Sequence, residues 1–404
     1  MTSRDRVIKT LQHQEPDKVP LDFGSMRSTG IMAVAYHRLK EHLGLTTGVT
    51  RIYDWIQQLG EVEKEMLDLF EVDVVDLENT SICPDRRRWK KWTLPDGAPA
   101  EIPSALNMRR IKNAWVVKDK RGKVVFQMPD GSYYFSPGPA RPLDKAKNIK
   151  DVRKYKFYIY TDQELERLHR RAQWLYKYTD YAIMGGFGGN ILESGQGLRG
   201  WEQFMVDLAK DPGFAAELMD RLVETHLINL RDYLAAVGDY IQIIQMGDDL
   251  GTQISPQISP QMYAELIKPR HQKIYQYVKE HSQVKVFLHS CGSIYDLIPD
   301  LIDAGVDVLN PVQTSAAKME PKKLKENFGD QLVFWGGGCD TQSILATATP
   351  KQIEHHVKER MKIFAPGGGF VFCQVHNIQA NVPVENIVAM FEAVKKYRNY
   401  PIRL

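Results

Sequence analysis

The chain has 404 residues, 43% of them hydrophobic and 25% charged, which is typical of a folded globular protein and excludes a disordered or collagen-like chain. Lysine and arginine number 53 against 50 acidic residues, and this net charge of +3 is too small for a dedicated nucleic-acid binder. No apolar run approaches the ~18 residues of a membrane span, and no signal-peptide pattern is present, so we expect a cytoplasmic protein without a membrane partner. The four scattered cysteines are expected to be reduced.

Short apolar runs alternate along the chain with stretches of helical spacing, a pattern typical of parallel β/α units. In chain order, the predicted strands are Val19–Phe23, Val72–Asp76, Ala182–Gly186, Ile241–Gly247, Val284–His289, Val306–Asn310, Leu332–Gly337 and Phe370–Val375. The clearest predicted helices are Trp201–Leu208, Pro212–Val237, Pro260–Glu280, Ile294–Ala304 and Pro350–Phe364, most of which begin near Asp, Ser, Thr or Pro. Eight strands close a barrel, so we predict an α/β protein with a single (β/α)8 TIM barrel over residues 1–404.

About a hundred residues separate the second and third predicted strands, which indicates a β-rich insertion over residues 80–150. Its centre, residues 113–135, alternates β-forming residues with turn signals such as Pro129-Asp130-Gly131. Because the insertion follows the carboxyl end of a strand, we expect it over the barrel mouth, as a lid, a substrate wall or a structural flap. Its aromatic residues would then line an aromatic substrate or only bury the insertion: Trp89, Trp92, Trp115, Tyr133 and Tyr134. The basic and aromatic run of residues 86–92 is either a docking surface or a solvated strand face.

The segment Phe287-Leu-His-Ser-Cys-Gly292 carries the strongest local signal for chemistry. Imidazole and thiolate are good Zn²⁺ ligands, and His289 and Cys291 leave the same strand two residues apart. By spacing alone, the favoured interpretation is structural, with His289 capping a strand and Cys291 a small buried thiol. Further ligand-capable residues follow other predicted strands, and a barrel would bring them to one cavity: Asp248, Asp249, Cys339, Asp340, Cys373 and His376.

Two other patterns bear on the same cavity. Because side chains alternate along a strand, only one of Cys373 and His376 is expected to point inward unless the chain has already turned. The glycine-rich stretch Gly185–Gly189 departs from the GxGxxG phosphate motif, and we interpret it as a wide turn that makes room in the active site.

Several motifs resemble the uroporphyrinogen decarboxylase superfamily, which also contains zinc-dependent, corrinoid-linked methyltransferases. They are the opening Arg4-Asp-Arg-Val-Ile-Lys-Thr-Leu with Pro16-Asp-Lys-Val-Pro20, the loop Gly186-Phe-Gly-Gly189, and the ending Val375-His-Asn-Ile-Gln-Ala-Asn-Val-Pro-Val-Glu-Asn386. The resemblance runs nearly end to end and implies a single (β/α)8 barrel. Decarboxylases of this superfamily hold their polycarboxylate substrate with an arginine-rich N-terminal loop, whereas residues 22–30 here offer only Arg27. His376 and Asp248 match residues of the decarboxylases, so that branch stays open.

The methyltransferase branch is marked by a His-x-Cys motif after the fifth strand and a cysteine at the eighth. His289 and Cys291 match the first part, while His376 stands where the coenzyme M methyltransferases have their cysteine, and Cys373 lies three residues earlier. The resemblance implies a Zn²⁺ ion held by His289, Cys291 and His376, with Cys373 as the alternative third ligand. Asp249 would be either a fourth ligand of the ion or a residue that hydrogen-bonds one of the three ligands.

The pairing of His-Ser-Cys-Gly with His-Asn-Ile-Gln resembles enzymes that take methyl groups from methoxylated compounds, including aryl methyl ethers, and pass them to a corrinoid protein. In that reaction zinc acts as a Lewis acid on the ether oxygen, cobalt(I) of a partner corrinoid protein attacks the methyl carbon, and Asp248 or Asp249 orients a ligand or supplies a proton. We interpret Cys339 as a buried neutral thiol, and the oligomeric state stays open, a homodimer included. Three alternatives remain: a thiol-methylating enzyme of the coenzyme M type, a metal-free decarboxylase using His376, Asp248 and Arg27, and a non-catalytic barrel that binds a tetrapyrrole or corrinoid carrier.

Overall fold

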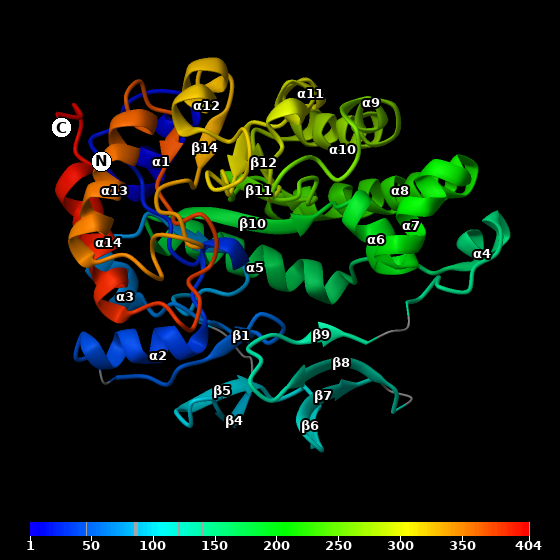
Figure 1. The fold of residues 1–404 in the computed structure, drawn as a ribbon, viewed down its shortest axis with the longest axis horizontal. Coiled ribbons are helices and arrows are strands. Elements are labelled where there is room, and N and C mark those ends of the chain that lie inside the picture. Colours follow the sequence, from blue (N-terminus) through cyan, green and yellow to red (C-terminus); the bar gives the residue numbers. More distant parts are fainter. Residues whose placement is uncertain (46, 85–87, 120–121, 139–140, 404) are drawn as a thin grey trace.

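A strongly curled parallel sheet forms the centre of the computed structural model, which describes residues 1–45, 47–84, 88–119, 122–138 and 141–403 (Figure 1). From one edge to the other, the strands follow one another in chain order, and every neighbouring pair is parallel. The seven strands are β3 (Val74–Asp76), β10 (Ala182–Gly188), β11 (Ile243–Gly247), β12 (Lys285–His289), β13 (Val308–Asn310), β14 (Val333–Trp335) and β15 (Phe370–Val371). They lie within or close to seven of the eight predicted strands.

Helices surround this sheet, most of them on its outer face (Figure 1). They are α1 (Ser3–Leu11), α2 (Ala33–His42), α3 (Lys64–Phe70), α4 (Ile149–Lys154), α5 (Asp162–Tyr178), α6 (Leu192–Arg199), α7 (Trp201–Lys210), α8 (Pro212–Val237), α9 (Pro260–Met262), α10 (Lys268–His281), α11 (Ile298–Ala304), α12 (Pro321–Phe328), α13 (Pro350–Phe364) and α14 (Val384–Tyr397). A π-helical turn at Tyr263–Ile267 joins α9 to α10, and short 3-10 turns lie at Arg27–Thr29 and Tyr295–Leu297. Within the described ranges, none of the helices is both long and apolar enough to cross a bilayer.

The core has two layers because successive side chains of a strand point to opposite faces of the sheet. One set of strand residues points inside the curled sheet, among them Met184, Phe287 and Trp335, and forms an interior cluster. Val7 and Leu11 of α1 belong to this cluster, so α1 covers one end of the interior. The other strand residues pack outward against the helices in a larger cluster.

The first predicted strand, Val19–Phe23, is not a regular strand, and this part of the prediction is wrong. The segment makes an isolated parallel bridge between Leu21 and Phe372, just past β15. The amide of Phe372 donates to the carbonyl of Pro20, and on the other side the amide of Asp73, just before β3, donates to the carbonyl of Leu21. Pro20 has no N–H to donate, which limits a regular ladder at this position.

Between β3 and β10 the chain forms two small antiparallel sheets. One pairs β4 (Trp89–Thr93) with β5 (Pro99–Pro103), and the other joins β6 (Met108–Ile111), β7 (Ala114–Lys118), β8 (Val124–Pro129) and β9 (Ser136–Pro137). Figure 1 shows them together on the side of α2 and of the hairpin β1 (Ile52–Asp54) with β2 (Leu59–Gly60). Residues 86 and 87 of the basic and aromatic run lie outside the described residues.

Candidate active site

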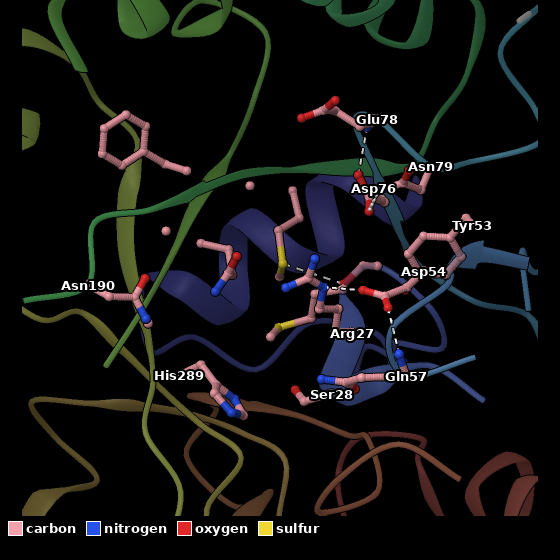
Figure 2. Close-up of a pocket in the computed structure, with 18 of the residues that line it drawn as sticks. Arg27, Ser28, Tyr53, Asp54, Gln57, Asp76, Glu78, Asn79, Asn190 and His289 are labelled. Atoms are coloured by element: carbon pink, nitrogen blue, oxygen red, sulfur yellow. Dashed lines mark hydrogen bonds and ion pairs between the residues drawn. The ribbon is translucent and has the colours of Figure 1, made fainter. Parts of the chain in front are cut away.

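A cavity of about 530 Å³ opens at the carboxyl ends of the central strands, the face where barrels of this architecture carry their active sites. It is lined by side chains from β3, β10, β11 and β12 and from the loops around residues 25–28 and 53–57 (Figure 2). The polar lining residues are Ser25, Arg27, Ser28, Tyr53, Asp54, Gln57, Asp76, Glu78, Asn79, Asn190, Glu193, Gln245, Asp249, His289 and His376. None of the insertion's tryptophans is among them. Trp92 and Trp115 instead pack on each other with ring centroids 4.4 Å apart, as expected if they bury the insertion.

The glycine-rich stretch of β10 provides room for this cavity. Gly186 and Gly188 line it, and a methyl group added at Gly186 would meet only the Oε1 atom of Gln245, at 3.8 Å. The wide turn expected at this position is not present, because residues 185–188 belong to the strand β10, but the missing side chains at Gly186 and Gly188 do leave room in the cavity. A larger side chain at residue 186 would project into the space.

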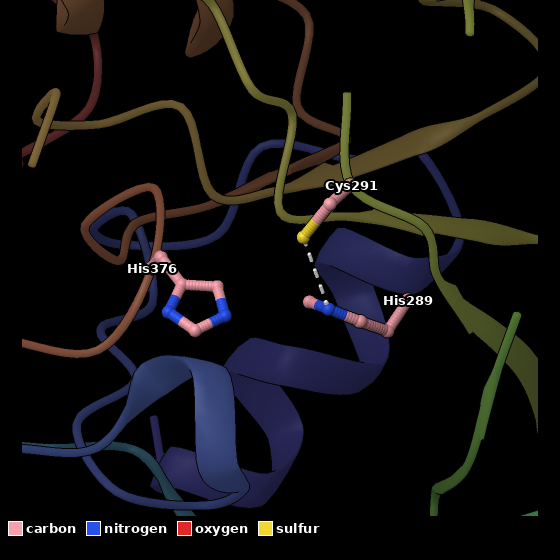
Figure 3. A group of neighbouring side chains, drawn as sticks. All are labelled: His289, Cys291 and His376. Atoms are coloured by element: carbon pink, nitrogen blue, oxygen red, sulfur yellow. Dashed lines mark hydrogen bonds between the residues drawn. The ribbon is translucent and has the colours of Figure 1, made fainter. Parts of the chain in front are cut away.

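His289 and His376 line the cavity and Cys291 lies next to them, although residue 376 is distant in sequence (Figure 3). One ligand atom from each of the three half-buried side chains lies within 4.8 Å of the other two. The Sγ atom of Cys291 is 3.3 Å from Nε2 of His289, and the two imidazole centroids are 5.9 Å apart. His289 ends β12, whereas His376 lies in the loop after β15.

The orientation of the His289 ring is set by Asn310 at the end of β13. The Nδ2 atom of Asn310 donates to the Trp335 carbonyl at 2.8 Å, so its Oδ1 atom faces His289 as an acceptor. Nδ1 of His289 lies 2.6 Å from that oxygen and must therefore be the protonated nitrogen. The lone pair of Nε2 then points toward Cys291, as a metal ligand requires.

Asp249 lies beside this group. Its Oδ1 atom accepts a hydrogen bond from the Cys291 amide at 2.8 Å and lies 3.7 Å from Nε2 of His289. Burial raises the pKa of the Cys291 thiol, and its contact with His376 acts in the opposite direction. A cation between the three side chains would favour the thiolate.

Asp248, predicted together with Asp249 as a catalytic candidate, lies elsewhere. It is fully buried and does not line the cavity. Its carboxylate accepts hydrogen bonds from the amides of residues 191, 192 and 193 at the start of α6, and it lies 3.0 Å from Nε2 of His271. Through these contacts the Asp248 carboxylate holds the start of α6 against the sheet.

Cys373 and Cys339 lie outside the group as well. Cys373 is fully buried in the interior cluster of the sheet, where burial raises its thiol pKa well above the usual range. Cys339 is also fully buried, and the same cause raises its pKa, as expected for a neutral thiol. Of the two candidates for a third ligand, His376 is the one that approaches His289 and Cys291.

Several cavity residues were missed by the sequence analysis. Burial raises the pKa of Asp76 to about 6, and burial together with the negative charges of Asp249 and Asp248 raises that of Glu193 to about 7. Asp76 ends a strand, so the same strand-end rule that selected Asp249 would have found it. Asn310 also ends a strand and would have been found by the same rule, whereas Glu193 carried no comparable signal, because it lies in α6 and its role depends on contacts between distant segments.

A cavity at the carboxyl ends of a curled parallel sheet, with titratable groups of perturbed pKa, is typical of enzymes. The family model of uroporphyrinogen decarboxylase matches residues 189–397, and the chain belongs to this family. Among solved structures, a methyltransferase from Methanosarcina mazei is similar in fold, with 18% identity over 98% of this chain and 99% of that chain and a TM-score of 0.58. A 7,8-dihydropteroate synthase from Vibrio fischeri ES114 is similar over 47% of this chain and 60% of that chain, at 12% identity and a TM-score of 0.24. A search of the curated proteins finds no match to the sequence.

Proposed function

We propose that this protein is a zinc-dependent methyltransferase that moves a methyl group from a methoxylated substrate, an aryl methyl ether above all, to the cobalt(I) of a partner corrinoid protein. The observation that carries the proposal is the meeting of His289, Cys291 and His376 within 4.8 Å at the cavity. The fold similarity to a methyltransferase and the family membership support it.

The donor set fits zinc on chemical grounds. Two imidazoles and one thiol are ligands that Zn²⁺ prefers, and three protein ligands leave the fourth position open, as catalytic zinc sites do. His289, Cys291 and His376 would hold the ion, with Asp249 beside them. When bound, zinc would supply Lewis acidity toward the oxygen that leaves the methyl group.

The chain's own residues have separate tasks in this proposal. Asn310 holds the His289 ring, and Asp249 holds the Cys291 loop through its amide. In the proposed transfer the methyl group would leave its oxygen for the partner's cobalt(I), which would supply the electron pair of the new bond, and the departing oxygen would take a proton. Glu193 is suited to deliver that proton because its pKa of about 7 leaves it partly protonated near neutral pH. Asp249 is the second candidate, and Asp248 is assigned to positioning α6.

A uroporphyrinogen-like polycarboxylate is disfavoured by the charge of the cavity. Arg27 is the one cationic residue among the lining residues described, and its guanidinium pairs with Asp54. Five carboxyl groups line the same space: Asp54, Asp76, Glu78, Glu193 and Asp249. A substrate with many carboxylates would meet repulsion there.

Metal analysis tests the proposal. We expect about one zinc per chain in the parent and its loss in His289→Ala, Cys291→Ser and His376→Ala. Two further variants should keep the metal. Cys373→Ala removes the alternative third ligand, and His355→Ala removes an exposed histidine as a control. A parent that takes up no zinc, or a metal content unchanged in the three variants, would overturn the metal site and favour a metal-free carboxy-lyase.

The proposal includes a closed barrel. We infer that residues 19–22, which bond to Phe372 on one side and Asp73 on the other, take the place of the eighth strand in a single unit of residues 1–404. The β-rich insertion would then be part of this unit.

A further inference from the structure

The cavity has two chemically different ends. Figure 2 shows His289 and Asn190 on one side and Tyr53, Asp76 and Glu78 on the opposite side. The first end carries the candidate metal ligands. The second end, formed by the last residue of β3, the loop after it and β1, has no part in the proposed chemistry.

The carboxyl groups of the cavity differ in how their charge is balanced. Arg27 pairs with Asp54, and the Arg167 guanidinium lies 2.7 Å from Glu78. Asp76 accepts hydrogen bonds from the Glu78 amide at 2.6 Å and the Asn79 side chain at 2.9 Å, but within the described ranges it forms no ion pair. Each carboxylate oxygen has two lone pairs, so Asp76 retains acceptor capacity toward the cavity.

The hydroxyl of Tyr53 adds a second, independent observation at the same end. It is buried and has no hydrogen-bond partner among the residues the structure describes, while Tyr53 lines the cavity beside Asp76. A buried hydroxyl without a partner is costly unless a bound molecule supplies one. Its oxygen can accept a hydrogen bond from a ligand, and its ring offers a face to a cation.

We propose that the end of the cavity formed by Asp76 and Tyr53 binds a positively charged ammonium group, so that the substrate is a methoxylated amine. This substrate class rests on the proposed function, because the methyl-bearing oxygen must reach the opposite end near His289. An ammonium brings donors for both the Asp76 carboxylate and the Tyr53 hydroxyl and balances the uncompensated charge. A cavity of about 530 Å³ is large enough for a molecule with one aromatic ring and two short substituents.

The test is equilibrium binding, measured by calorimetry at pH 7.5 with three ligands of nearly equal size. They are 4-methoxybenzylamine, which is cationic, 4-methoxybenzyl alcohol, which is neutral, and 4-methoxybenzoate, which is anionic. We expect the amine to bind about tenfold more tightly than the alcohol, and the benzoate to bind weakest. Equal binding of amine and alcohol, tightest binding of the benzoate through Arg27, or no binding of the amine would overturn the proposal.

Variants locate the effect. Asp76→Asn should weaken amine binding about tenfold and leave alcohol binding within about twofold, because only the amine needs the carboxylate charge. The control Asp330→Asn removes an exposed carboxylate and should change neither. If Asp76→Asn does not fold, Tyr53→Phe serves instead, with a selective loss of amine binding expected. If a variant lost the same amount of affinity for the amine and for the alcohol, Asp76 and Tyr53 would only support the shape of the cavity and would not bind the ammonium group.

The binding readout separates this inference from the proposed function. Selective amine binding without methyl transfer or zinc uptake would keep the cation site and reject the methyltransferase. Methyl transfer with the benzoate as the best substrate would keep the methyltransferase and reject the cation site.

Discussion

At the residue scale, Asn310 determines which nitrogen of His289 is available to a metal. Asn310→Ala removes the acceptor for Nδ1, so the ring is free to turn and to change its tautomer. We expect zinc affinity to fall about 10- to 100-fold with all three ligands still present. A competition titration against a chelator measures this. Asn327→Ala, which removes an amide that bonds the Tyr295 hydroxyl at the surface, is the control, and equal affinities in the two variants would contradict the prediction.

Asp22 is a second residue with a measurable effect, because it is buried beside Trp335, whose indole donates to it at 2.8 Å. Burial raises the pKa of Asp22 from 3.8 to about 6. The native state therefore holds this proton longer than the unfolded chain, and the free energy of unfolding falls as the pH rises from about 4 to 6. A shift of about two units corresponds to at most about 3 kcal/mol.

Asp22→Asn cannot ionise, so it should lose less stability than the parent between pH 4 and pH 7.5. Urea unfolding at both pH values measures the difference. Asp330→Asn serves as the exposed control and should follow the parent. Parallel pH dependence of parent and Asp22→Asn would contradict the prediction.

The sequence predicted the meeting of His289, Cys291 and His376 better than the rest of the cavity. His289 and Cys291 share one short motif, and His376 follows a strand, so strand order and the family resemblance together brought them to one place. Asp248 and Asp249 are adjacent in sequence, and only the packing of α6 decides that Asp248 turns into the core while Asp249 faces the cavity. No local pattern distinguishes two neighbouring carboxylates of this kind.

At the scale of elements, the loops that follow β11 and β12 touch backbone to backbone. A Cβ atom at Gly292 would lie 2.5 Å from the carbonyl carbon of Gly251, and the φ angle of Gly292 is 90°. Gly292→Ala should therefore separate the two loops and displace Cys291. We expect a loss of about 1–3 kcal/mol in the free energy of unfolding, together with loss of zinc.

Denaturant unfolding and metal analysis measure the two effects. Gly197→Ala on α6 is the matched control, since no atom lies within 4 Å of an added Cβ there, and it should keep both stability and metal. A Gly292→Ala protein with full zinc content would show that the close loop contact does not position Cys291.

Helix bounds were predicted well where the capping signals are strong. The helices α8 and α13 match their predicted ranges because Asp211 and Thr349 cap them and proline is their first residue. The helix predicted from Pro260 to Glu280 contains a π-helical turn that no side-chain pattern signals. The strand predicted to Val375 ends at Val371, and the next residues form only isolated bridges, Phe372 with Leu21 and Gln374 with Cys339.

At the scale of the whole molecule, Asp73 joins distant parts of the chain. It is buried and accepts hydrogen bonds from the Leu21 amide at 2.9 Å, from Arg6 at 2.5 Å and from Arg398 at 3.2 Å. Asp73→Ala leaves two buried guanidinium groups without this partner, and we expect a loss of about 3–5 kcal/mol. Chemical denaturation followed by two spectroscopic probes measures it, with Asp330→Asn as the control. A loss below about 1 kcal/mol would show that Arg6 and Arg398 find other partners.

The segment at residues 19–22 also has a consequence for the order of events during synthesis. Its partner at Phe372 leaves the ribosome some 350 residues after it, at roughly 5–20 residues per second. The early segment must wait for that partner, and Arg27 cannot meet His376 in the cavity lining before then. The cavity is therefore completed only after residues 372–376 have been made, so a shortened chain that ended before Phe372 would lack both the closing contact and His376.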